Sequence, residues 1–210
     1  KANRNAAPST FDSPPAARLK ETAANIFAKT TMPDCGLLAA GVSSMFGIVR
    51  NPWHRDYNTG GSSAGAGASL ASGMGFLSVG SDIAGSVRCP AGHCGLASLK
   101  PTQGRIPHLM PEFMRSAGPM GRTVEDIAHL MTILSGADER DPWSFPPEDI
   151  AYQDRLDRDL KGLRIGILTD MGFGPKPEQV VRETVEAAGK ALADQGAIVE
   201  PFVSPLDGDC

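Results

Sequence analysis

The sequence contains 210 residues with a formal net charge of −4, and 41% of the residues are hydrophobic while 21% are charged. This composition is typical of a globular protein with a sizeable buried core, and its acidic balance provides neither a basic surface for nucleic acid nor a polybasic face for a membrane. We therefore expect a small molecule or another protein as the binding partner.

The first part of the chain begins with a helix signal. A Ser-Pro pair precedes residues 15–24, whose amphipathic pattern predicts a short helix. Residues 25–29 (NIFAK) predict a short strand and residues 30–36 a loop, and the chain stays irregular as far as Thr59.

The middle of the chain predicts two helices and two strands. Residues 62–73 (SSAGAGASLASG) predict a helix of small residues that can pack closely against its neighbours. Buried strands are predicted at residues 76–80 and 94–100. The strongest helix pattern covers residues 123–136, where Thr123 suits the N-cap and acidic residues follow in the first turn.

The last part of the chain alternates strand and helix. Residues 163–168 predict a strand, residues 177–196 an amphipathic helix and residues 197–202 a second strand. This alternation predicts an α/β fold with a largely parallel or mixed sheet.

We interpret residues 1–210 as a single domain. Residues 1–140 would form the core part, residues 141–162 a polar connector, and residues 163–210 a further β-α-β part of the same domain. The sequence starts with Lys rather than Met and stops soon after a strand-like run, so we expect a piece of a longer protein, truncated at both ends.

Targeting signals are not apparent in the sequence. It contains no apolar run long enough to span a bilayer and no signal-peptide pattern at its start. Its four cysteines are too few and too irregularly spaced for a disulfide framework, which favours a reducing, cytoplasmic environment.

One run, residues 58–90 (NTGGSSAGAGASLASGMGFLSVGSDIAGSVRCP), combines many glycines and serines with almost no charge. Its apolar anchors, such as Leu70 and Phe76, argue against a flexible linker. A phosphate-binding loop is disfavoured because neither a Lys-Ser/Thr pair nor a leading apolar strand accompanies the glycines. A literal Gly-x-Ser-x-Gly match would make Ser63 a nucleophile, but the preceding residues are too polar for the strand that this motif requires.

The same run and its flanks resemble the amidase signature family. GGSSAG, SDIAGSVRCP and CGLASLKPTQGR stand where members carry a GGSSGG-type loop, a D-x-G-G-S-x-R-x-P turn and a C-G-x-x-x-L-K-P-T-x-G-R block. FGIVRNPW and GPMGRTVEDIAHLM extend the similarity, which covers roughly residues 10–203. The resemblance implies an α/β amidase-signature fold with a mixed central sheet flanked by helices.

The resemblance also implies an amidase, a hydrolase that cleaves a carboxylic amide C–N bond through a serine acyl-enzyme, with no cofactor and no metal. Mapped onto this sequence, the family's Ser-cisSer-Lys triad has Ser86 as nucleophile and Ser62, 24 residues earlier, as the bridging serine, with a cis peptide bond between Gly61 and Ser62. A hydroxyl both donates and accepts, so Ser62 can relay the proton of Ser86 to a base. In the family this base is a buried lysine kept neutral by desolvation.

Further roles follow from the resemblance. The oxyanion would be bound by the backbone N–H groups of Ile83, Ala84, Gly85 and Ser86. Asp82, Arg88 and Ser63 would support this turn without touching the substrate. Met32 would border the substrate. Ala84 stands where the family usually has Gly, which predicts a negative φ at this residue, or strain.

The triad is incomplete in this sequence. The family's catalytic lysine lies in a stretch further upstream than this chain reaches, and the context of Lys1, Lys29 and Lys100 differs from that stretch. The relay would therefore end on a lysine that these residues do not include.

The CPAGHC segment invites a zinc interpretation through Cys89, His93 and Cys94. No second ligand pair follows at a finger-like spacing, and Cys94 falls where the family commonly has a buried cysteine. We therefore expect no metal at this segment.

Two alternative functions stay open. One is the glutaminase subunit of a tRNA-dependent transamidation complex, which would deliver ammonia to a partner; the other is a non-catalytic remnant of the family. In the favoured interpretation the partner is a small-molecule amide, nucleic acid and membrane are not bound directly, and a homodimer is left open.

Overall fold

The structure, a computed structural model, describes residues 7–109, 112–146 and 148–204. The chain divides into two compact units, Lys1–Leu156 and Asp157–Cys210. The boundary falls inside the predicted connector, residues 141–162, and the assignment of both units to a single domain remains a prediction.

The first unit begins with helix α1 (Pro14–Glu21), whose Ser-Pro start was predicted. A 3-10 helix, η1 (Asp34–Gly36), and a short antiparallel hairpin of β1 (Val42–Ser43) and β2 (Gly47–Ile48) follow.

The predicted strand at residues 25–29 is wrong. These residues are exposed and have no regular structure, because no strand among the described residues pairs with them and a strand is stable only when paired. The ring of Phe27 instead covers Gly75, where an added Cβ would lie 3.2 Å from the Phe27 Cζ.

A three-stranded antiparallel sheet forms the centre of the first unit, in the order β3 (Ser78–Asp82), β5 (Ser116–Gly121), β4 (Ala97–Ser98). The predicted strands at residues 76–80 and 94–100 are thus present but shorter or shifted, and Phe76 is exposed rather than an anchor. The completely buried β5 has the sequence SAGPMG, and its lack of β-branched and aromatic residues left no strand pattern to detect.

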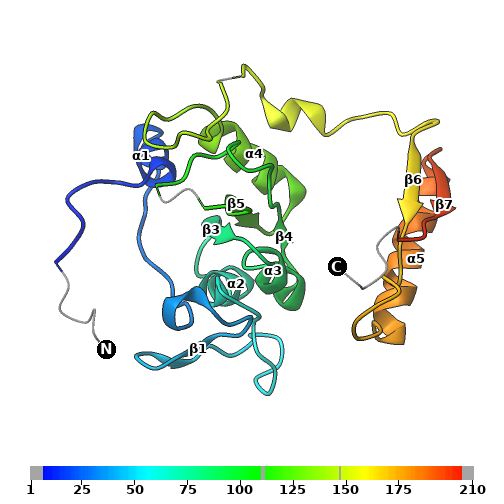
Figure 1. Cartoon of the computed structure of the whole chain (residues 1–210), viewed down its shortest axis with the longest axis horizontal. Coiled ribbons are helices and arrows are strands. Elements are labelled where there is room, and N and C mark those ends of the chain that lie inside the picture. The colour runs from blue at the N-terminus through cyan, green and yellow to red at the C-terminus, as the bar shows by residue number, and fades with distance from the viewer. Residues whose placement is uncertain (1–6, 110–111, 147, 205–210) are drawn as a thin grey trace. The chain divides into compact units, whose positions relative to one another are not determined.

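Helices cover both faces of this sheet (Figure 1). Helix α4 (Val124–Leu134) packs on one face with Ala117 of β5, whereas α2 (Ala64–Ala71) and α3 (Arg88–Cys94) pack on the other with Met120. The two β5 side chains point to opposite faces because they are an odd number of residues apart. Thr123 forms the capping box that begins α4 together with Asp126, which confirms the predicted helix start.

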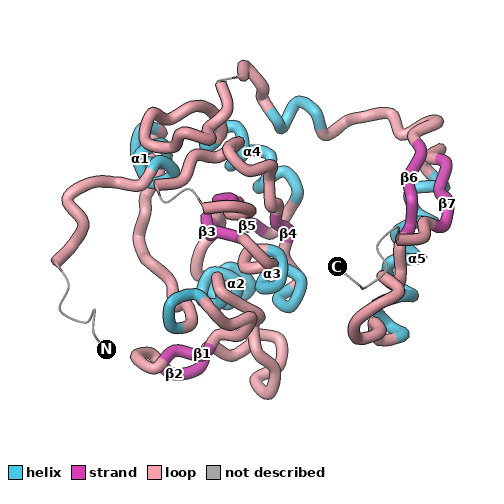
Figure 2. The backbone as a smooth tube through the Cα atoms, in the orientation of Figure 1, coloured by secondary structure: helices cyan, strands magenta, loops and turns pink. Residues whose placement is uncertain are grey.

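A second 3-10 helix, η2 (Tyr152–Arg155), lies beside α4, where the Tyr152 N–H donates to the Thr132 Oγ1. The second unit consists of β6 (Arg164–Ile167), α5 (Gln179–Asp194) and β7 (Ile198–Pro201), with the two strands paired in parallel, as predicted. Figure 2 shows the whole backbone coloured by secondary structure, with β6 and β7 as strands and α5 as a helix. Gly189 of α5 permits close packing on the sheet, since an added Cβ would lie 3.1 Å from the Ile167 Cγ1.

The α/β class is confirmed, and both strand senses occur, in separate sheets of the described residues. Within the described ranges, no helix has the length and apolar character needed to cross a membrane.

Candidate active site

Two serine-containing turns meet at the N-terminal ends of α2 and α3. The first turn carries Ser62 and Ser63 and leads into α2, and the second carries Ser86 and connects β3 to α3. The Ser63 N–H donates to the Ser86 carbonyl oxygen at 3.0 Å. Serines 23 residues apart in the sequence are therefore joined by a direct backbone hydrogen bond, which keeps their two turns adjacent.

The turn before Ser62 fits against the loop that follows η1. The peptide bond between Gly61 and Ser62 is cis, as the resemblance implied. A Cβ added at Gly61 would lie 2.6 Å from the Leu38 carbonyl oxygen and 2.7 Å from the Ala40 nitrogen. Only glycine therefore allows this approach, which leaves Ser62 buried.

Met32 and Ser62 both lie beside Gly36. A Cβ added at Gly36 would be 3.1 Å from the Met32 Cε and 3.7 Å from the Ser62 Oγ. The Met32 side chain is half exposed. An apolar, accessible side chain thus borders the predicted relay serine.

Asp82, at the end of β3, anchors the second turn. Its fully buried carboxylate accepts hydrogen bonds from the backbone N–H groups of Gly85 at 2.7 Å, Val87 at 3.1 Å and Arg88 at 3.2 Å. The Arg88 guanidinium adds two more, from Nε at 3.0 Å and from Nη2 at 2.9 Å. Burial by itself would raise the pKa of Asp82, but the bonds from Arg88 and from the three N–H groups hold that pKa well below its usual range.

The backbone of the second turn settles the expectation for Ala84. Gly85 has a φ of +112°, whereas Ala84 is not among the described non-glycine residues with positive φ. The glycine next to Ala84 thus takes the conformation that alanine disfavours, and the predicted negative φ of Ala84 is confirmed.

The predicted oxyanion donors differ in the hydrogen bonds that their backbone N–H groups make in the structure. The Gly85 N–H donates to Asp82, so an oxyanion would compete with this carboxylate for it. No acceptor is found in the described residues for the N–H groups of Ile83, Ala84 and Ser86. Ala84 is exposed, and Ile83 and Ser86 are half-buried. The assignment of all four groups as oxyanion donors remains a prediction.

Ser63 is directed toward the sheet. A Cβ added at Gly80 of β3 would lie 2.4 Å from the Ser63 Oγ and 2.9 Å from the Val87 Cγ2. The Ser63 side chain therefore packs over the strand while its N–H contacts the neighbouring turn. The supporting role of Ser63 remains a prediction.

The described lysines of the first unit make contacts other than to the two predicted catalytic serines. Lys20 pairs with Asp12 at 2.7 Å, the Lys100 Nζ donates to the Ser116 Oγ at 3.3 Å, and Lys29 is exposed. Lys1 lies outside the described residues.

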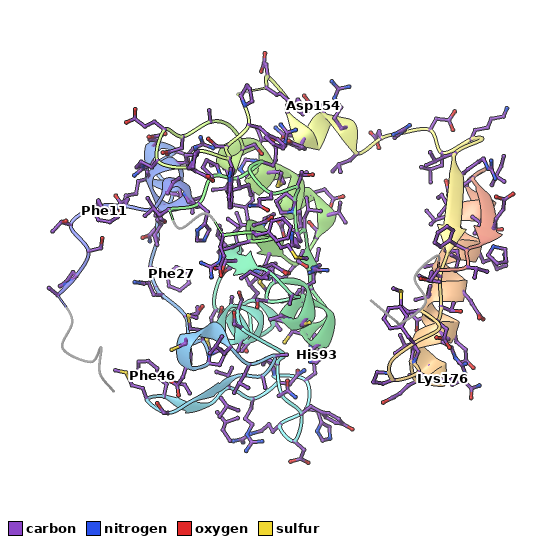
Figure 3. All side chains as sticks on the ribbon, viewed as in Figure 1. Phe11, Phe27, Phe46, His93, Asp154 and Lys176 are labelled. Atoms are coloured by element: carbon purple, nitrogen blue, oxygen red, sulfur yellow. The ribbon has the colours of Figure 1, made fainter. Side chains whose placement is uncertain are left out.

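The CPAGHC segment lies within α3. His93 lies exposed at the end of the helix (Figure 3). Cys94 is buried, its Sγ lies 3.9 Å from the Thr59 carbonyl oxygen, and burial raises the pKa of its thiol. In the part of the chain that the structure describes, no group of three His, Cys, Asp or Glu side chains could hold a metal ion.

Sequence reasoning missed the backbone that brings the turns together. Gly60 packs against the Cys89 carbonyl carbon, which an added Cβ would approach to 2.9 Å, and Gly80 makes room for Ser63. A glycine inside a predicted strand is a signal of close backbone approach. That signal was present at Gly80, but it did not indicate which residue would approach.

The fold and the paired serine turns define a chain of the amidase type, and comparison with known proteins agrees. The family profile described as Amidase matches residues 2–206, and the chain belongs to this family. A glutamyl-tRNA(Gln) amidotransferase subunit of Clostridium botulinum is 36% identical over 202 residues, which cover 94% of this chain and 41% of that relative.

Solved structures of the family are similar as well. A bacterial aryl acylamidase of the amidase signature family superposes with a TM-score of 0.88 at 29% identity, over 95% of this chain and 42% of its own. 6-Aminohexanoate cyclic dimer hydrolase complexed with substrate gives a TM-score of 0.83 at 30% identity, over 92% of this chain and 42% of its own. The chain thus spans about two fifths of the length of the relatives it matches.

Proposed function

We propose that the protein hydrolyses a carboxylic amide through a serine acyl-enzyme, with Ser86 as the nucleophile and Ser62 as the proton relay. The observation that carries this proposal is the hydrogen bond of 3.0 Å from the Ser63 N–H to the Ser86 carbonyl oxygen. Because Ser62 directly precedes Ser63, this bond keeps the two serine-bearing turns adjacent.

The proposed reaction has two stages, acylation of Ser86 and hydrolysis of the ester, and both move protons through Ser62. The Ser86 Oγ attacks the amide carbonyl carbon and forms an O–C bond, while its proton passes through Ser62 to a base. The tetrahedral intermediate collapses, the C–N bond breaks, and the amine leaves with a proton returned through the same relay. Water then attacks the ester, loses a proton to the relay, releases the carboxylic acid and restores the Ser86 hydroxyl.

The base at the end of the relay is proposed to be a lysine outside residues 1–210. Support comes from the described lysines of the first unit, since Lys20 pairs with Asp12, Lys100 donates to Ser116, and Lys29 is exposed. A lysine serves this role only when burial lowers its pKa enough for it to accept a proton near neutral pH.

The oxyanion is proposed to be bound by the N–H groups of the turn, Ile83, Ala84, Gly85 and Ser86. Of these, Ile83, Ala84 and Ser86 have no acceptor in the described part of the chain. Each such donor contributes about 3 kcal/mol to transition-state stabilisation in a well-formed site. Asp82 and Arg88 are proposed to hold the turn in shape from the side opposite the substrate, and Ser63 to hold it against the first turn.

The substrate is proposed to be a small-molecule amide whose apolar part contacts Met32. The relatives are named for different amides, an aryl acylamide in one structure and a cyclic dimer of 6-aminohexanoate in another. A cytoplasmic location is part of the proposal, and a homodimer is left open. The free thiols of Cys35, Cys89 and Cys94 fit the reducing conditions of the cytoplasm.

A second candidate function is favoured by one observation, the 36% identity to a glutamyl-tRNA(Gln) amidotransferase subunit. In this case the same serines would hydrolyse glutamine and supply ammonia to partner proteins. Glutaminase activity that depends on added tRNA and on co-purifying partner proteins would support it, whereas hydrolysis of simple amides by the isolated protein would support the first candidate.

The test is active-site labelling of the protein at its full natural length. A serine-directed fluorophosphonate is expected to label Ser86, as located by mass spectrometry of the digested protein. Ser62→Ala should slow labelling by a factor of about 100 or more, since the relay is lost, with little change in melting temperature. Labelling at Ser63, or labelling of Ser62→Ala at the rate of the unchanged protein, would contradict the assignment.

A further inference from the structure

Cys89, in the first turn of α3, lies between the two serine-bearing turns and contacts both. Its N–H donates to the Gly85 carbonyl oxygen at 2.7 Å. A Cβ added at Gly85 would lie 2.6 Å from the Cys89 Sγ, so the thiol packs directly against the Gly85 Cα. On its other side, a Cβ added at Gly60 would lie 2.9 Å from the Cys89 carbonyl carbon.

We propose that Cys89 is a positioning residue for the reaction: its thiol sets the place of Gly85 relative to the Gly60–Ser62 turn. This inference rests on the proposed function, because it acts on the turn that carries Ser86. Gly85 stands between Ala84 and Ser86, whose N–H groups are proposed oxyanion donors. A displacement of Gly85 therefore moves both donors and the nucleophile together.

The size of the side chain at residue 89 decides this placement. Asp82 fixes Gly85 from one side through the bond of 2.7 Å to its N–H, and the Cys89 sulfur contacts the Gly85 Cα. A smaller side chain leaves a void beside Gly85, and a β-branched side chain adds a methyl group to a contact that is already close. Serine, which keeps an atom near the sulfur position, preserves the contact best.

The same helix provides a matched control. Cys94 also belongs to α3 and is fully buried, but its thiol packs near Gly67, where an added Cβ would lie 3.3 Å from the Cys94 Sγ. Cys94→Ala therefore loosens the packing of α3 on α2 without removing a contact to the Ser86 turn. A purely structural role of the helix cysteines would make the two alanine variants behave alike.

The experiment uses the protein at its full natural length and measures the rate of fluorophosphonate labelling at increasing probe concentration. This series separates the maximal labelling rate from the probe concentration that gives half of this rate. We expect Cys89→Ala and Cys89→Val to lower the maximal rate by about 10-fold or more with an unchanged half-maximal concentration, because a misplaced turn affects the reacting geometry and not the encounter. Cys89→Ser should stay within about 3-fold of the unchanged protein, as a near-isosteric replacement that avoids overpacking.

The outcomes separate this inference from the proposed function. Cys94→Ala should lower the melting temperature and leave the maximal rate unchanged. If Cys89→Ala and Cys89→Val label Ser86 at the unchanged rate, or if the rates of all four variants simply follow their melting temperatures, Cys89 does not position the turn and Ser86 remains the nucleophile. If mass spectrometry finds the label of the unchanged protein at another residue, both proposals are overturned.

Discussion

Replacing Asp82 by Asn tests the central physical argument about the second turn. The Asp82 carboxylate accepts five hydrogen bonds, two at Oδ1 from Gly85 and Arg88 and three at Oδ2 from Val87 and Arg88. Asn keeps one acceptor oxygen and presents an NH2 group where the other oxygen stood. At least two donors therefore lose their acceptor and face another donor.

The expected loss of stability in Asp82→Asn follows from the burial of the Asp82 side chain. Removing one partner of a buried ion pair costs about 3–5 kcal/mol. The Asp82 side chain is 0% exposed but that of Arg88 is 52% exposed, so water can replace part of what Arg88 loses. We therefore expect the lower end, a loss of about 3 kcal/mol in the free energy of unfolding. The turn also loses the bonds that orient it, and labelling of Ser86 should slow by about 100-fold.

Two measurements check this expectation, urea unfolding and the rate of fluorophosphonate labelling at neutral pH without urea. Asp138→Asn is the control, since Asp138 pairs with Arg140 at 2.7 Å away from both serine turns, and this guanidinium lowers the pKa of Asp138 to about 2. The control should leave labelling unchanged. An Asp82→Asn protein that unfolds and labels like the unchanged protein would refute the idea that this carboxylate organises the turn.

The remaining predictions concern pH, packing and thiol chemistry. The pKa of Asp82 is lower in the folded than in the unfolded protein, so the stabilisation that it provides is fully present above the ordinary pKa of about 4 and is lost as the pH falls further. The difference in unfolding free energy between the unchanged protein and Asp82→Asn should therefore be constant above a pH of about 5 and shrink below a pH of about 4. Gly80→Ala should destabilise the protein by about 1–3 kcal/mol in urea unfolding, since the added Cβ meets the Ser63 Oγ. Gly92→Ala, at an exposed helix position with open space around it, should be neutral or stabilising, and equal effects of the two substitutions would contradict the packing argument. Cys94 should react with a thiol-specific disulfide reagent only on unfolding, because it is buried and its pKa is raised, while exposed Cys35 reacts in the folded protein; similar rates in the folded protein would be inconsistent with this burial.

Patterned segments could be predicted from the sequence. The helix beginning after Thr123 has a cap, acidic first-turn residues and a 3.6-residue apolar period, and it forms with the capping box that these features predict. The β6–α5–β7 unit was equally clear, because its strands and helix have the periods of their class. In both cases local chemistry and long-range packing favour the same structure.

Strand β5 and the segment at residues 25–29 show the opposite case. β5 is buried across its whole length, but its glycines and proline carry no strand preference, so only pairing with β3 and β4 makes it a strand. Residues 25–29 have the preference but no partner, and remain irregular. Strand propensity describes the fit of a side chain to a sheet surface and therefore fails where pairing decides.

The position of the two serines depends on close backbone contacts rather than on side-chain chemistry. Gly67 of α2 packs against Pro90 of α3, with an added Cβ at 3.1 Å from the Pro90 Cβ, and this approach brings the N-terminal ends of both helices together. The Ser63 N–H can then reach the Ser86 carbonyl oxygen. A larger side chain at residue 67 would push the two helices apart even though it would not contact either serine. The small residues between Ser62 and Ser86 thus determine the geometry that the proposed relay needs, although none of them takes part in the chemistry.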